Sequence, residues 1–406
     1  MTEIVLGTAL LTLVILFLTA TVILARRVLM PSRAVTLTVN GTKQIAARAG
    51  DRLLSALNDG GILVPSACAG AGTCGLCRVT VTDGGGAALP TEAAILTLAE
   101  RRQGQRLACQ LVLRGDVELD VPEDALGADT FTCTVREARF LTPLIREVVL
   151  DLPPGTHPQI VAGSFLQITA PVYSLPLSDL TVPPEHARIW DQFRALSVNN
   201  ETPVTRAYSI SNRPEDNRAG RIVLNIRLAL PPPTLVGVPP GIVSTYLFGV
   251  SPGDPVLASG PFGSFRAQET GREMVFIGGG VGMAPLRAII LDQLERIGTG
   301  RRMSFWYGAR NEAELFYFDE MDDLARRYPN FRWTPALSDP RPSGGWQGAT
   351  GFVHQVVQER FLAGHAAPED CEYYLCGPPL MIKAVLAMLD DAGVNKAAIF
   401  NDDFGS

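Results

Sequence analysis

Four cysteines of this chain have a spacing that suits a metal cluster. Cys68, Cys74 and Cys77 form the pattern C-x5-C-x2-C, and Cys109 follows alone after a long gap. A [2Fe–2S] cluster needs four thiolates, and the plant-type arrangement takes three from one loop and the fourth from far along the chain. Zinc sites more often pair two C-x2-C motifs. The pattern therefore predicts a [2Fe–2S] cluster, with zinc as the weaker alternative.

The residues around these cysteines favour the same interpretation. Gly70, Gly72 and Gly75 lie in the loop, and glycine permits the positive φ angles that let backbone N–H groups turn toward sulfur atoms. Cys133 and Cys371 have no partner at a motif spacing, so we expect them to be core or surface thiols.

A second group of residues could hold a diphosphate and a flat ring. Arg206 and Tyr208 lie two positions apart on a predicted strand and therefore face the same side. An arginine can pair with a pyrophosphate, a tyrosine can pack on a ring, and Ser209 could donate a hydrogen bond. By itself, this tetrapeptide is a weak signal.

A short predicted helix follows, and its first turn could bind a phosphate. It begins at Gly241 and carries Ser244 and Thr245, so free N–H groups and the positive end of the helix dipole would face a ligand. An ordinary helix cap is the commoner use of such residues. A third, turn-rich segment at 259–265 would close the barrel, and the three segments together, in this order, are more specific than any one.

The last third of the chain contains a glycine-rich turn between a strand and a helix. A predicted buried strand over 274–277 runs into this turn, which suits a diphosphate at a helix N-terminus. The turn is not a clean G-x-G-x-x-G, so its signal is weak when taken alone. Its glycines are Gly278, Gly279, Gly280 and Gly282.

Two further segments could lie beside the same ligand. Cys376 and Gly377 end a later predicted strand, and ligands bind along the carboxyl edge of a parallel sheet. A buried small residue is the alternative for Cys376. Phe404, near the C-terminus, could cover the face of a bound flat ring, although an aromatic residue there usually has no special role.

The N-terminal residues predict a membrane anchor. Residues 4–25 carry no charge, and at about 1.5 Å per residue such a helix spans the hydrocarbon core of a bilayer. A signal peptide would need a basic start and a small-residue cleavage site, whereas Arg26 and Arg27 follow the apolar stretch here. We expect residues 1–30 to be a retained single-pass transmembrane anchor, in contact with lipid through residues 4–25. The positive-inside rule places the following domains in the cytoplasm.

The remaining pattern predicts a multidomain protein. A length of 406 residues suggests two to four domains, and the net charge of -6 argues against nucleic-acid binding. Residues 31–128 predict a β-grasp, ferredoxin-like α+β domain, with a strand at 35–39, a turn at Asn40-Gly41 and a helix at 51–59. Residues 123–129 resemble a linker.

Residues 129–268 predict an antiparallel β-barrel, because their short strands are separated by proline and glycine. We expect an insertion at 173–205 and one helix near 186–196. Residues 269–406 predict an α/β doubly wound nucleotide-binding domain, with strands alternating with helices at 284–297, 315–327, 353–361 and 380–392.

From Phe131 to its end, the chain resembles the ferredoxin–NADP+ reductase superfamily. The shared motifs are R-A-Y-S at 206–209, P-G-I-V-S-T at 240–245, G-G-G-V-G-M-A-P at 278–285, Y-G-A-R at 307–310 and C-G-P-P-L-M at 376–381. With the cysteine module and the anchor, the whole chain resembles the F-subunit family of Na+-translocating NADH:quinone oxidoreductases. Further signatures are W-D-Q-F at 190–193, A-L-S-D-P at 336–340 and D-D-F-G at 402–405.

The resemblance implies a role for each candidate residue. The four cysteines would ligate the [2Fe–2S] cluster, and the glycines of the 278–282 turn, with Gly377, would carry the NADH diphosphate. Cys376 would lie near the hydride path, and Phe404 would stack on the flavin. The residues that would hold FAD are Arg206, Tyr208, Ser209, Gly241, Ser244 and Thr245, with Ser209 close to the reactive flavin nitrogen.

The activity implied by the resemblance is NADH oxidation. A hydride would pass to FAD, and single electrons would pass to the cluster and on to partner membrane subunits and ubiquinone. The whole complex would couple this transfer to Na+ translocation in the bacterial inner membrane. The alternatives are a reductase component that feeds an oxygenase and a non-catalytic membrane-bound iron–sulfur redox sensor. Glu312 and Glu314 disfavour a 2′-phosphate whereas Arg310 favours one, so the preference for NADH over NADPH rests on the resemblance.

Overall fold

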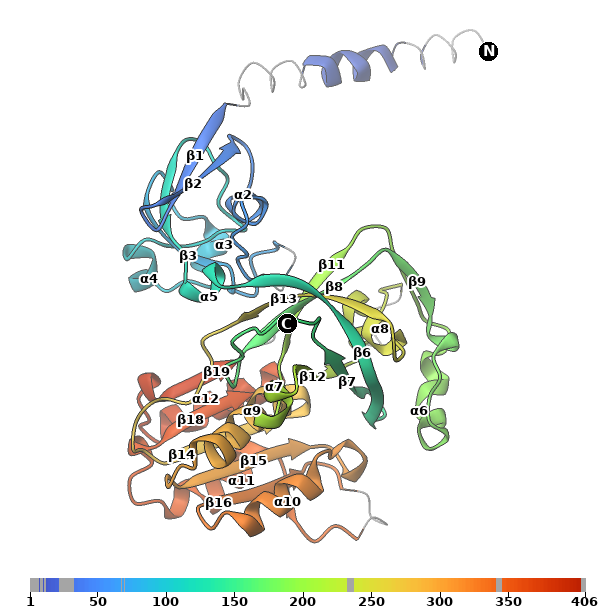
Figure 1. The fold of residues 1–406 in the computed structure, drawn as a ribbon, viewed down its shortest axis with the longest axis vertical. Helices are drawn as coiled ribbons and strands as arrows, with labels where there is room; N and C mark the ends of the chain where they lie inside the picture. Colours follow the sequence, from blue (N-terminus) through green and yellow to red (C-terminus); the bar gives the residue numbers. More distant parts are fainter. Residues whose placement is uncertain are drawn as a thin grey trace. The chain divides into compact units, whose positions relative to one another are not determined.

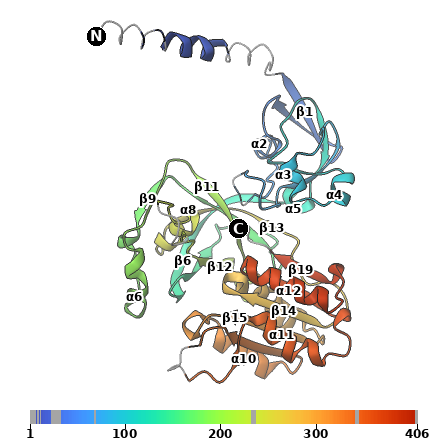
Figure 2. The same cartoon turned by 180° about the vertical axis from the view of Figure 1, so that it is seen from behind.

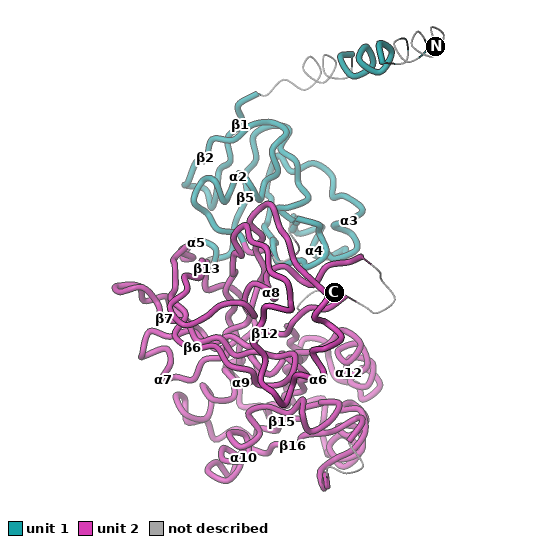
Figure 3. The backbone as a smooth tube through the Cα atoms, turned by 90° about the vertical axis from the view of Figure 1, so that its right-hand side faces the viewer, with its two compact units in different colours: residues 1–64, 70–126 teal, residues 65–69, 127–406 magenta. Residues whose placement is uncertain are grey.

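The computed structural model describes residues 7, 10, 12–21, 33–66, 68, 70–231, 237–340 and 345–402. The chain divides into two compact units, which Figure 3 colours separately. The first unit comprises residues 1–64 and 70–126, and the second comprises residues 65–69 and 127–406.

The N-terminal segment is described only in part. Residues 12–21 are helical, and apolar side chains such as Leu16 and Phe17 are exposed. No helix in the described ranges combines the length and the apolar character that a membrane crossing requires. Much of the predicted anchor, including residues 4–6 and 22–25, lies outside the described residues.

The first unit, in which Figure 1 labels β1, β2 and β3, is built on a mixed sheet with the strand order β2-β1-β5-β3-β4. β1 and β5 are parallel, and the other neighbours are antiparallel. The helix α2 (Leu53–Asp59) packs Leu53, Ala56 and Leu57 into the core beneath the sheet. The other elements are β1 (Ala34–Val39), β2 (Lys43–Arg48), β3 (Arg78–Asp83), β4 (Gln105–Leu107), β5 (Val117–Asp120), α3 (Pro90–Ala93), α4 (Leu98–Arg102) and α5 (Glu123–Leu126).

Local sequence explains the start of this unit. Asn40 and Gly41 have φ angles of 48° and 67°, as the two central residues of a type I′ hairpin turn require. The predicted strand, turn and helix in this region are confirmed. The expected linker is only partly irregular, because α5 occupies its first half and β6 begins at Asp129.

The second unit begins with a curled antiparallel sheet of strand order β11-β8-β13-β6-β7-β12. An antiparallel bridge between Ile210 and Leu224 joins the two outer strands, so the sheet curls toward closure. Its strands are β6 (Asp129–Thr142), β7 (Ile145–Asp151), β8 (Phe165–Ala170), β11 (Val204–Ser209), β12 (Arg221–Arg227) and β13 (Pro255–Phe262).

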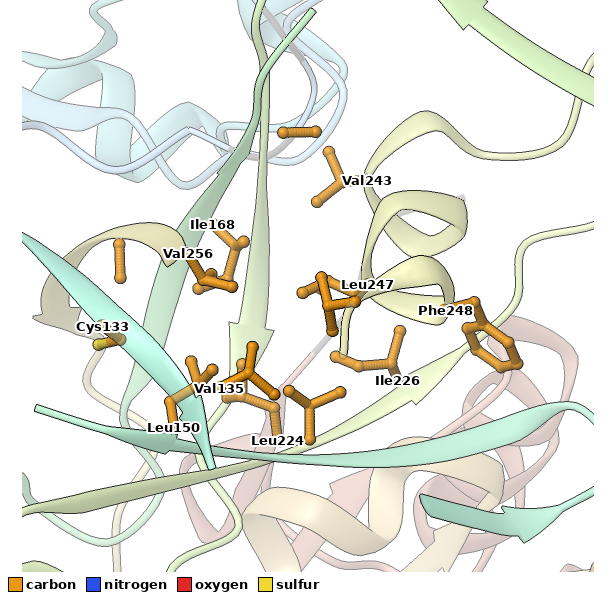
Figure 4. Packing of buried hydrophobic residues seen from close by; sticks show 14 of the residues in the cluster. Cys133, Val135, Leu150, Ile168, Leu224, Ile226, Val243, Leu247, Phe248 and Val256 are labelled. Atoms are coloured by element: carbon orange, nitrogen blue, oxygen red, sulfur yellow. The ribbon is translucent and has the colours of Figure 1, made fainter. Parts of the chain in front are cut away.

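A short helix, α8 (Ile242–Gly249), packs on the concave core of this sheet. Figure 4 shows Val243 and Leu247 of α8 in the same cluster as the strand residues Ile168, Leu224 and Val256. All of these side chains are nearly or fully buried. This packing anchors the helix whose first turn was predicted to hold a phosphate.

The predicted insertion forms a separate hairpin of β9 (Tyr173–Pro176) and β10 (Ser197–Asn200). The single helix expected near 186–196 is wrong in its extent. The segment contains α6 (Ala187–Trp190) between two 3-10 turns, because Trp190 is buried and its indole N–H donates to Pro143 O at 2.7 Å. A further helix, α7 (Pro214–Arg218), was not predicted; a proline at its start and Asp216 at its third position begin it.

The rest of the second unit is a parallel sheet with the order β17-β16-β15-β14-β18-β19. The helices α9 and α10 bury their apolar sides in one core and α11 and α12 in another, so helices flank both faces (Figures 1 and 2). The doubly wound prediction is confirmed. The elements are β14 (Met274–Gly279), β15 (Met303–Ala309), β16 (Phe331–Leu337), β17 (Ala349–Thr350), β18 (Glu372–Cys376), β19 (Ile399–Asp402), α9 (Met283–Leu291), α10 (Phe318–Arg327), α11 (Val353–Arg360) and α12 (Pro379–Asp391).

Two boundaries differ from expectation. α10 begins at Phe318 rather than Leu315, because Tyr317 adopts a left-handed conformation (φ 54°) and a 3-10 turn precedes it. After Leu291, the helix α9 continues as a π-helical turn, Asp292–Ile297, and ends at Gly298 with φ 66°.

Candidate functional site

Two of the predicted cluster ligands lie beside each other in the first unit. Cys77 and Cys109 are fully buried, and the backbone N–H of Ala108 donates to Cys77 O at 2.8 Å. The thiol of Cys77 donates to Cys109, which lowers the pKa of Cys109 and raises that of Cys77. Cys74 is half-buried in the same unit, and Cys68 is half-buried on segment 65–69 of the second unit.

Donors converge on this pair as a thiolate-ligated cluster would require. Gln110 Nε2 lies 3.4 Å from Cys109 Sγ and also donates to Gly70 O at 2.8 Å. The guanidinium of Arg52 donates to Gly70 O and Cys109 O, both at 3.1 Å. Hydrogen bonds and positive charge stabilise anionic sulfur. The donor set therefore fits a [2Fe–2S] cluster.

The glycines of this loop have the backbone conformations that were expected. Gly70, Gly72 and Gly75 have φ angles of 83°, 78° and 68°. A Cβ atom at Gly72 would lie 2.8 Å from the side chain of Gln110, the residue that donates to Cys109. The loop therefore needs glycine there both for its backbone angle and for the close approach of Gln110.

A cavity of ≈ 280 Å³ opens between β11, β12 and α8 in the second unit. Five of the predicted flavin-binding residues line it together. Thr245 does not line this cavity: it is fully buried, and its Oγ1 has no hydrogen-bond partner among the described residues. The five are Arg206, Tyr208, Ser209, Gly241 and Ser244.

The start of α8 is braced by its own side chain. The hydroxyl of Ser244 donates to Gly241 O at 3.0 Å and accepts the N–H of Ala229 at 3.1 Å. A Cβ atom at Gly241 would lie 2.7 Å from the Cβ of Ala229, so glycine allows this close turn. The first turn of α8 thus presents its N–H groups beside Arg206, a combination that fits an anionic diphosphate.

Ser209 connects this cavity to the last described strand. Its hydroxyl donates to the carboxylate of Asp402 at 3.0 Å, which joins the end of β11 to the end of β19. Sequence reasoning noted the D-D-F-G ending but did not pair Asp402 with Ser209, because the contact links residues far apart in the chain. Phe404 lies outside the described residues.

A larger cavity of ≈ 740 Å³ lies at the carboxyl edge of the parallel sheet. Gly279 and Gly280 line it, whereas Gly278, Gly282, Cys376 and Gly377 do not. A Cβ atom at Gly282 would clash with Cys376 O and lie 2.8 Å from Gly377 N. Cys376 itself is fully buried. These residues therefore pack the two loops together behind the cavity wall.

Several residues that line the cavities were not predicted. Phe352 and Leu380 line the larger cavity, and their side chains are 61% and 84% exposed. Asn225 lines the smaller cavity, and Arg227 lines both cavities. A visible signal for Asn225 was its polar side chain inside the apolar run I-V-L-N-I.

A polar network joins the curled sheet to the α/β part within the second unit. The guanidinium of Arg287, on α9, is 4% exposed; it pairs with Glu320 at 2.5 Å and donates to Ser211 O. The Tyr317 hydroxyl donates to the Glu147 carboxylate and accepts the amide N–H of Asn225 at 2.8 Å. Arg287 also stacks over the Tyr317 ring at 4.3 Å. The network ties α9 and α10 to β7 and β12.

Comparisons with known proteins agree with a cysteine-rich cluster-binding domain followed by a nucleotide-binding reductase part. Residues 37–114 match the family model described as a 2Fe-2S iron-sulfur cluster binding domain, and residues 276–387 match the oxidoreductase NAD-binding domain. The chain is 46% identical over 409 residues to the F subunit of the Na(+)-translocating NADH-quinone reductase of Idiomarina loihiensis, covering 100% of both chains. It is 45% identical over 408 residues to the corresponding protein of Methylococcus capsulatus, again covering 100% of both.

A solved structure is similar over most of the chain as well. A cytochrome P450 reductase from Amycolatopsis has a TM-score of 0.62 and 27% identity, and the match covers 91% of this chain and 98% of that one. The ferredoxin-like domain and the reductase fold with its curled sheet are thus shared. Because the identity to the quinone-reductase relatives is higher and extends over the full length, the chain belongs to the F-subunit family of Na+-translocating NADH-quinone reductases.

Proposed function

We propose that this chain admits electrons from NADH into a membrane-bound, multisubunit Na+-translocating NADH–quinone reductase. The observation that carries the proposal is the identity of 45–46% over the whole length to relatives of the F-subunit family. The iron–sulfur and NAD-binding family models, matched in one chain, agree with it. Electrons would pass from this chain to partner subunits and finally to quinone.

The cofactors supply the electron chemistry, and the protein positions them. When bound, FAD exchanges a two-electron hydride for single electrons, and the [2Fe–2S] cluster relays those electrons one at a time. Cys68, Cys74, Cys77 and Cys109 would hold the cluster. Gln110 and Arg52 would stabilise the negative charge on its sulfur ligands, because both donate beside Cys109.

The flavin would occupy the cavity between β11, β12 and α8. Arg206 and the first turn of α8, at Gly241 and Ser244, would hold the diphosphate, and Tyr208 would pack on the ring. Ser209 would donate its hydrogen bond near the reactive nitrogen. Thr245, which is buried with its hydroxyl unpartnered among the described residues, would support the helix from the core side.

NADH would occupy the cavity at the carboxyl edge of the parallel sheet. Gly279 and Gly280 would contact its diphosphate directly. Gly278, Gly282 and Gly377 would act by allowing the two loops to pack closely. Cys376, being fully buried, would line the hydride path only through its backbone or after a local movement, and Phe404 would cover the flavin ring.

We further propose the membrane placement and the domain limits. Residues 1–30 would be a single transmembrane anchor in the bacterial inner membrane, lipid-facing at 4–25, with the later domains in the cytoplasm. Those domains would be the ferredoxin-like domain at 31–128, the FAD barrel at 129–268 and the NADH domain at 269–406. The uncharged stretch at 4–25 followed by Arg26 and Arg27 supports this arrangement.

Two other functions make different predictions. In a reductase that feeds an oxygenase, NADH would also bleach the flavin and iron–sulfur absorption bands, but the electrons would pass to an oxygenase partner. The similarity to a cytochrome P450 reductase, at only 27% identity, supports this alternative. A redox sensor without turnover would contain the cluster but would lack flavin and NADH oxidation.

The decisive experiment is an anaerobic absorption spectrum of a chain that starts at Ser32, recorded before and after NADH or NADPH is added. We expect flavin and iron–sulfur bands that both bleach with NADH and respond far more weakly to NADPH. Cluster bands without flavin, or bands that do not bleach, would contradict the proposal. Restored quinone reduction by the full-length chain, in membranes that lack the native protein, would then separate it from the oxygenase alternative.

A further inference from the structure

Three side chains that can ligate a metal meet at the amino-terminal edge of the parallel sheet. Nε2 of His365 lies 3.4 Å from Oε2 of Glu273 and 3.8 Å from Sγ of Cys371. All three ligand atoms lie within 4.8 Å of one another. Cys371 was expected to be an ordinary thiol, because its partners come from elsewhere in the chain.

The sheet holds two of these residues in place. Glu273 directly precedes β14 and Cys371 directly precedes β18, and these strands are parallel neighbours with Met274 opposite Glu372. The N–H of Glu372 donates to Glu273 O at 2.8 Å. A ladder hydrogen bond therefore fixes Glu273 against Glu372, and the N–H of Cys371, the residue just before Glu372, donates to Pro368 O at 3.2 Å.

His365 completes the cluster from a third element. It follows the 3-10 turn Leu362–Gly364, and its ring packs against Phe361 with centroids 4.8 Å apart. The side chains of His365 and Glu273 are 17% and 13% exposed, and Cys371 is 1% exposed. The cluster is thus sheltered but remains reachable from solvent on one side.

Two of the three distances between ligand atoms are close to those of a tetrahedral zinc site. With Zn–S near 2.3 Å and Zn–N or Zn–O near 2.0–2.1 Å, ligand atoms of a tetrahedral site are about 3.3–3.6 Å apart. The two measured separations, 3.4 Å and 3.8 Å, are within a few tenths of an ångström of that range. We propose that Glu273, His365 and Cys371 bind a zinc ion, with water as the fourth ligand.

The donor set selects among ions. One thiolate, one imidazole and one carboxylate suit zinc, whereas magnesium and calcium prefer oxygen ligands alone. With the thiol deprotonated and Glu273 ionised, the two negative ligands balance the charge of the ion. Arg302, which contacts Glu273 Oε2 at 2.8 Å, would remain as an outer partner of that carboxylate.

Binding has two local costs. The backbone N–H of Ala367 donates to Nδ1 of His365 at 3.2 Å, which places the ring proton on Nε2. Zinc at Nε2 moves that proton to Nδ1, so this hydrogen bond is lost. The pKa of Cys371 is raised to about 11 by burial and by the Glu273 carboxylate, so the ion also displaces the thiol proton to solvent. Three metal–ligand bonds replace the contacts of His365 with Glu273, Cys371 and Ala367 and the contact of Cys371 Sγ with Ala367 O at 4.0 Å.

The position assigns the ion a structural role. The site lies at the amino ends of β14 and β18, whereas the predicted NADH contacts lie at the carboxyl ends of the same strands. Zinc would therefore link the turn after α11 to the two central strands without entering the electron path.

The test is metal analysis of the full-length holoprotein in detergent. The protein is dialysed against buffered micromolar zinc, and bound zinc and iron are measured together by mass spectrometry. We expect one zinc per chain, with the iron content unchanged. Cys371→Ser and His365→Gln should each weaken zinc binding at least about tenfold. Cys133→Ser, which alters a buried cysteine in the curled-sheet core, should bind zinc as the unaltered chain does.

X-ray absorption at the zinc edge supplies a second readout. We expect one sulfur neighbour near 2.3 Å together with nitrogen or oxygen neighbours. Zinc that displaces iron, zinc with several sulfur neighbours, or zinc binding that survives both substitutions would overturn the assignment. So would a chain that binds no zinc under these conditions. The His365→Gln variant keeps the test valid if Cys371→Ser does not fold, because His365 is not a core residue.

Discussion

At the residue scale, the buried pair Cys77 and Cys109 in the first unit allows the proposed cluster ligands to be tested by substitution. Cys109 is fully buried beside Cys77, with Gln110 and Arg52 as donors around it. A serine there would keep the size of the side chain but would replace a thiolate ligand with a poor one. The cavity proposed to bind flavin belongs to the second unit, and Cys109 does not line it.

We therefore expect Cys109→Ser to lose the [2Fe–2S] absorption while NADH still bleaches the flavin. Electron transfer to quinone should fall at least about tenfold, because the relay of single electrons is lost. Absorption spectra and quinone-reductase assays in reconstituted membranes measure both effects. Cys133→Ser is the matched control and should retain the cluster. A Cys109→Ser protein with an intact cluster spectrum would remove this residue from the ligand set.

At the element scale, the two loops of the proposed NADH site depend on close packing. Gly282 lies at the start of α9, and an added Cβ atom would clash with Cys376 O and approach Gly377 N to 2.8 Å. These neighbours are backbone atoms, which cannot swing aside as a side chain can. The glycine-rich turn and the loop after β18 therefore form one wall.

The prediction at this scale concerns Gly282→Ala. We expect the methyl group to push the two loops apart, to destabilise the fold by about 1–3 kcal/mol and to raise the KM for NADH about tenfold. Thermal unfolding and steady-state kinetics with an artificial electron acceptor measure these effects. Gly271→Ala is the control, because nothing lies within 4 Å of its added Cβ. Equal behaviour of the two variants would show that the loops do not pack as described.

At the scale of the whole molecule, buried polar contacts join the two halves of the reductase unit. The Tyr317 hydroxyl reaches Glu147 on β7 and Asn225 on β12, while its residue begins α10. Hydride transfer requires the nicotinamide and flavin to meet within a few tenths of an ångström of the productive distance. The hydrogen bonds of Tyr317 between these halves should therefore affect the rate of hydride transfer as well as the free energy of unfolding.

We expect Tyr317→Phe to slow flavin reduction by NADH about tenfold, with little change in KM. The loss of two buried hydrogen bonds should also cost about 1–3 kcal/mol of stability. Stopped-flow bleaching of the flavin and thermal unfolding measure the two effects. Tyr246→Phe is the control, because that hydroxyl, on α8, donates to Pro255 O on β13 of the curled sheet, and this bond does not join the sheet to the α/β part. A purely structural role would lower stability without slowing the reduction step.

The same network predicts a response to acid. Burial alone would raise the pKa of Glu320, but the hydrogen bond from Arg287 and the charges of Arg287 and Arg213 outweigh it and hold the pKa below its usual 4.5. The folded state then binds this proton less readily than the unfolded state. The stabilisation is full above pH 4.5 and is lost as the pH falls through the lower folded pKa.

We expect Glu320→Gln to unfold at a lower temperature than the unaltered chain at pH 7, with the difference shrinking below pH 4.5. Thermal unfolding, monitored through the release of flavin at a series of pH values, measures this difference. Glu359→Gln, at an exposed position on α11, should leave the curve unchanged. A difference that stays constant down to the most acidic pH would contradict the ion-pair explanation.

Local patterns in the sequence determined the parts of this protein that depend on neighbouring residues. The spacing of Cys68, Cys74 and Cys77, the Asn40-Gly41 turn and the glycine-rich turn after β14 each need particular residue types at fixed offsets, because backbone angles and ligand geometry are set within a few positions. Alternation of strands and helices likewise predicted the parallel sheet, since each element buries its own apolar face.

Only the tertiary structure decided which distant residues meet. The packing of the parallel sheet against the curled sheet places Asp402 beside Ser209, and the order of the parallel sheet places Glu273 beside Cys371; neither pair shares a local pattern. The tertiary structure also buries Cys376 and Thr245, which sequence position alone had suggested as ligand contacts. Which face of a strand or helix turns inward depends on what packs against it, and that partner comes from elsewhere in the chain.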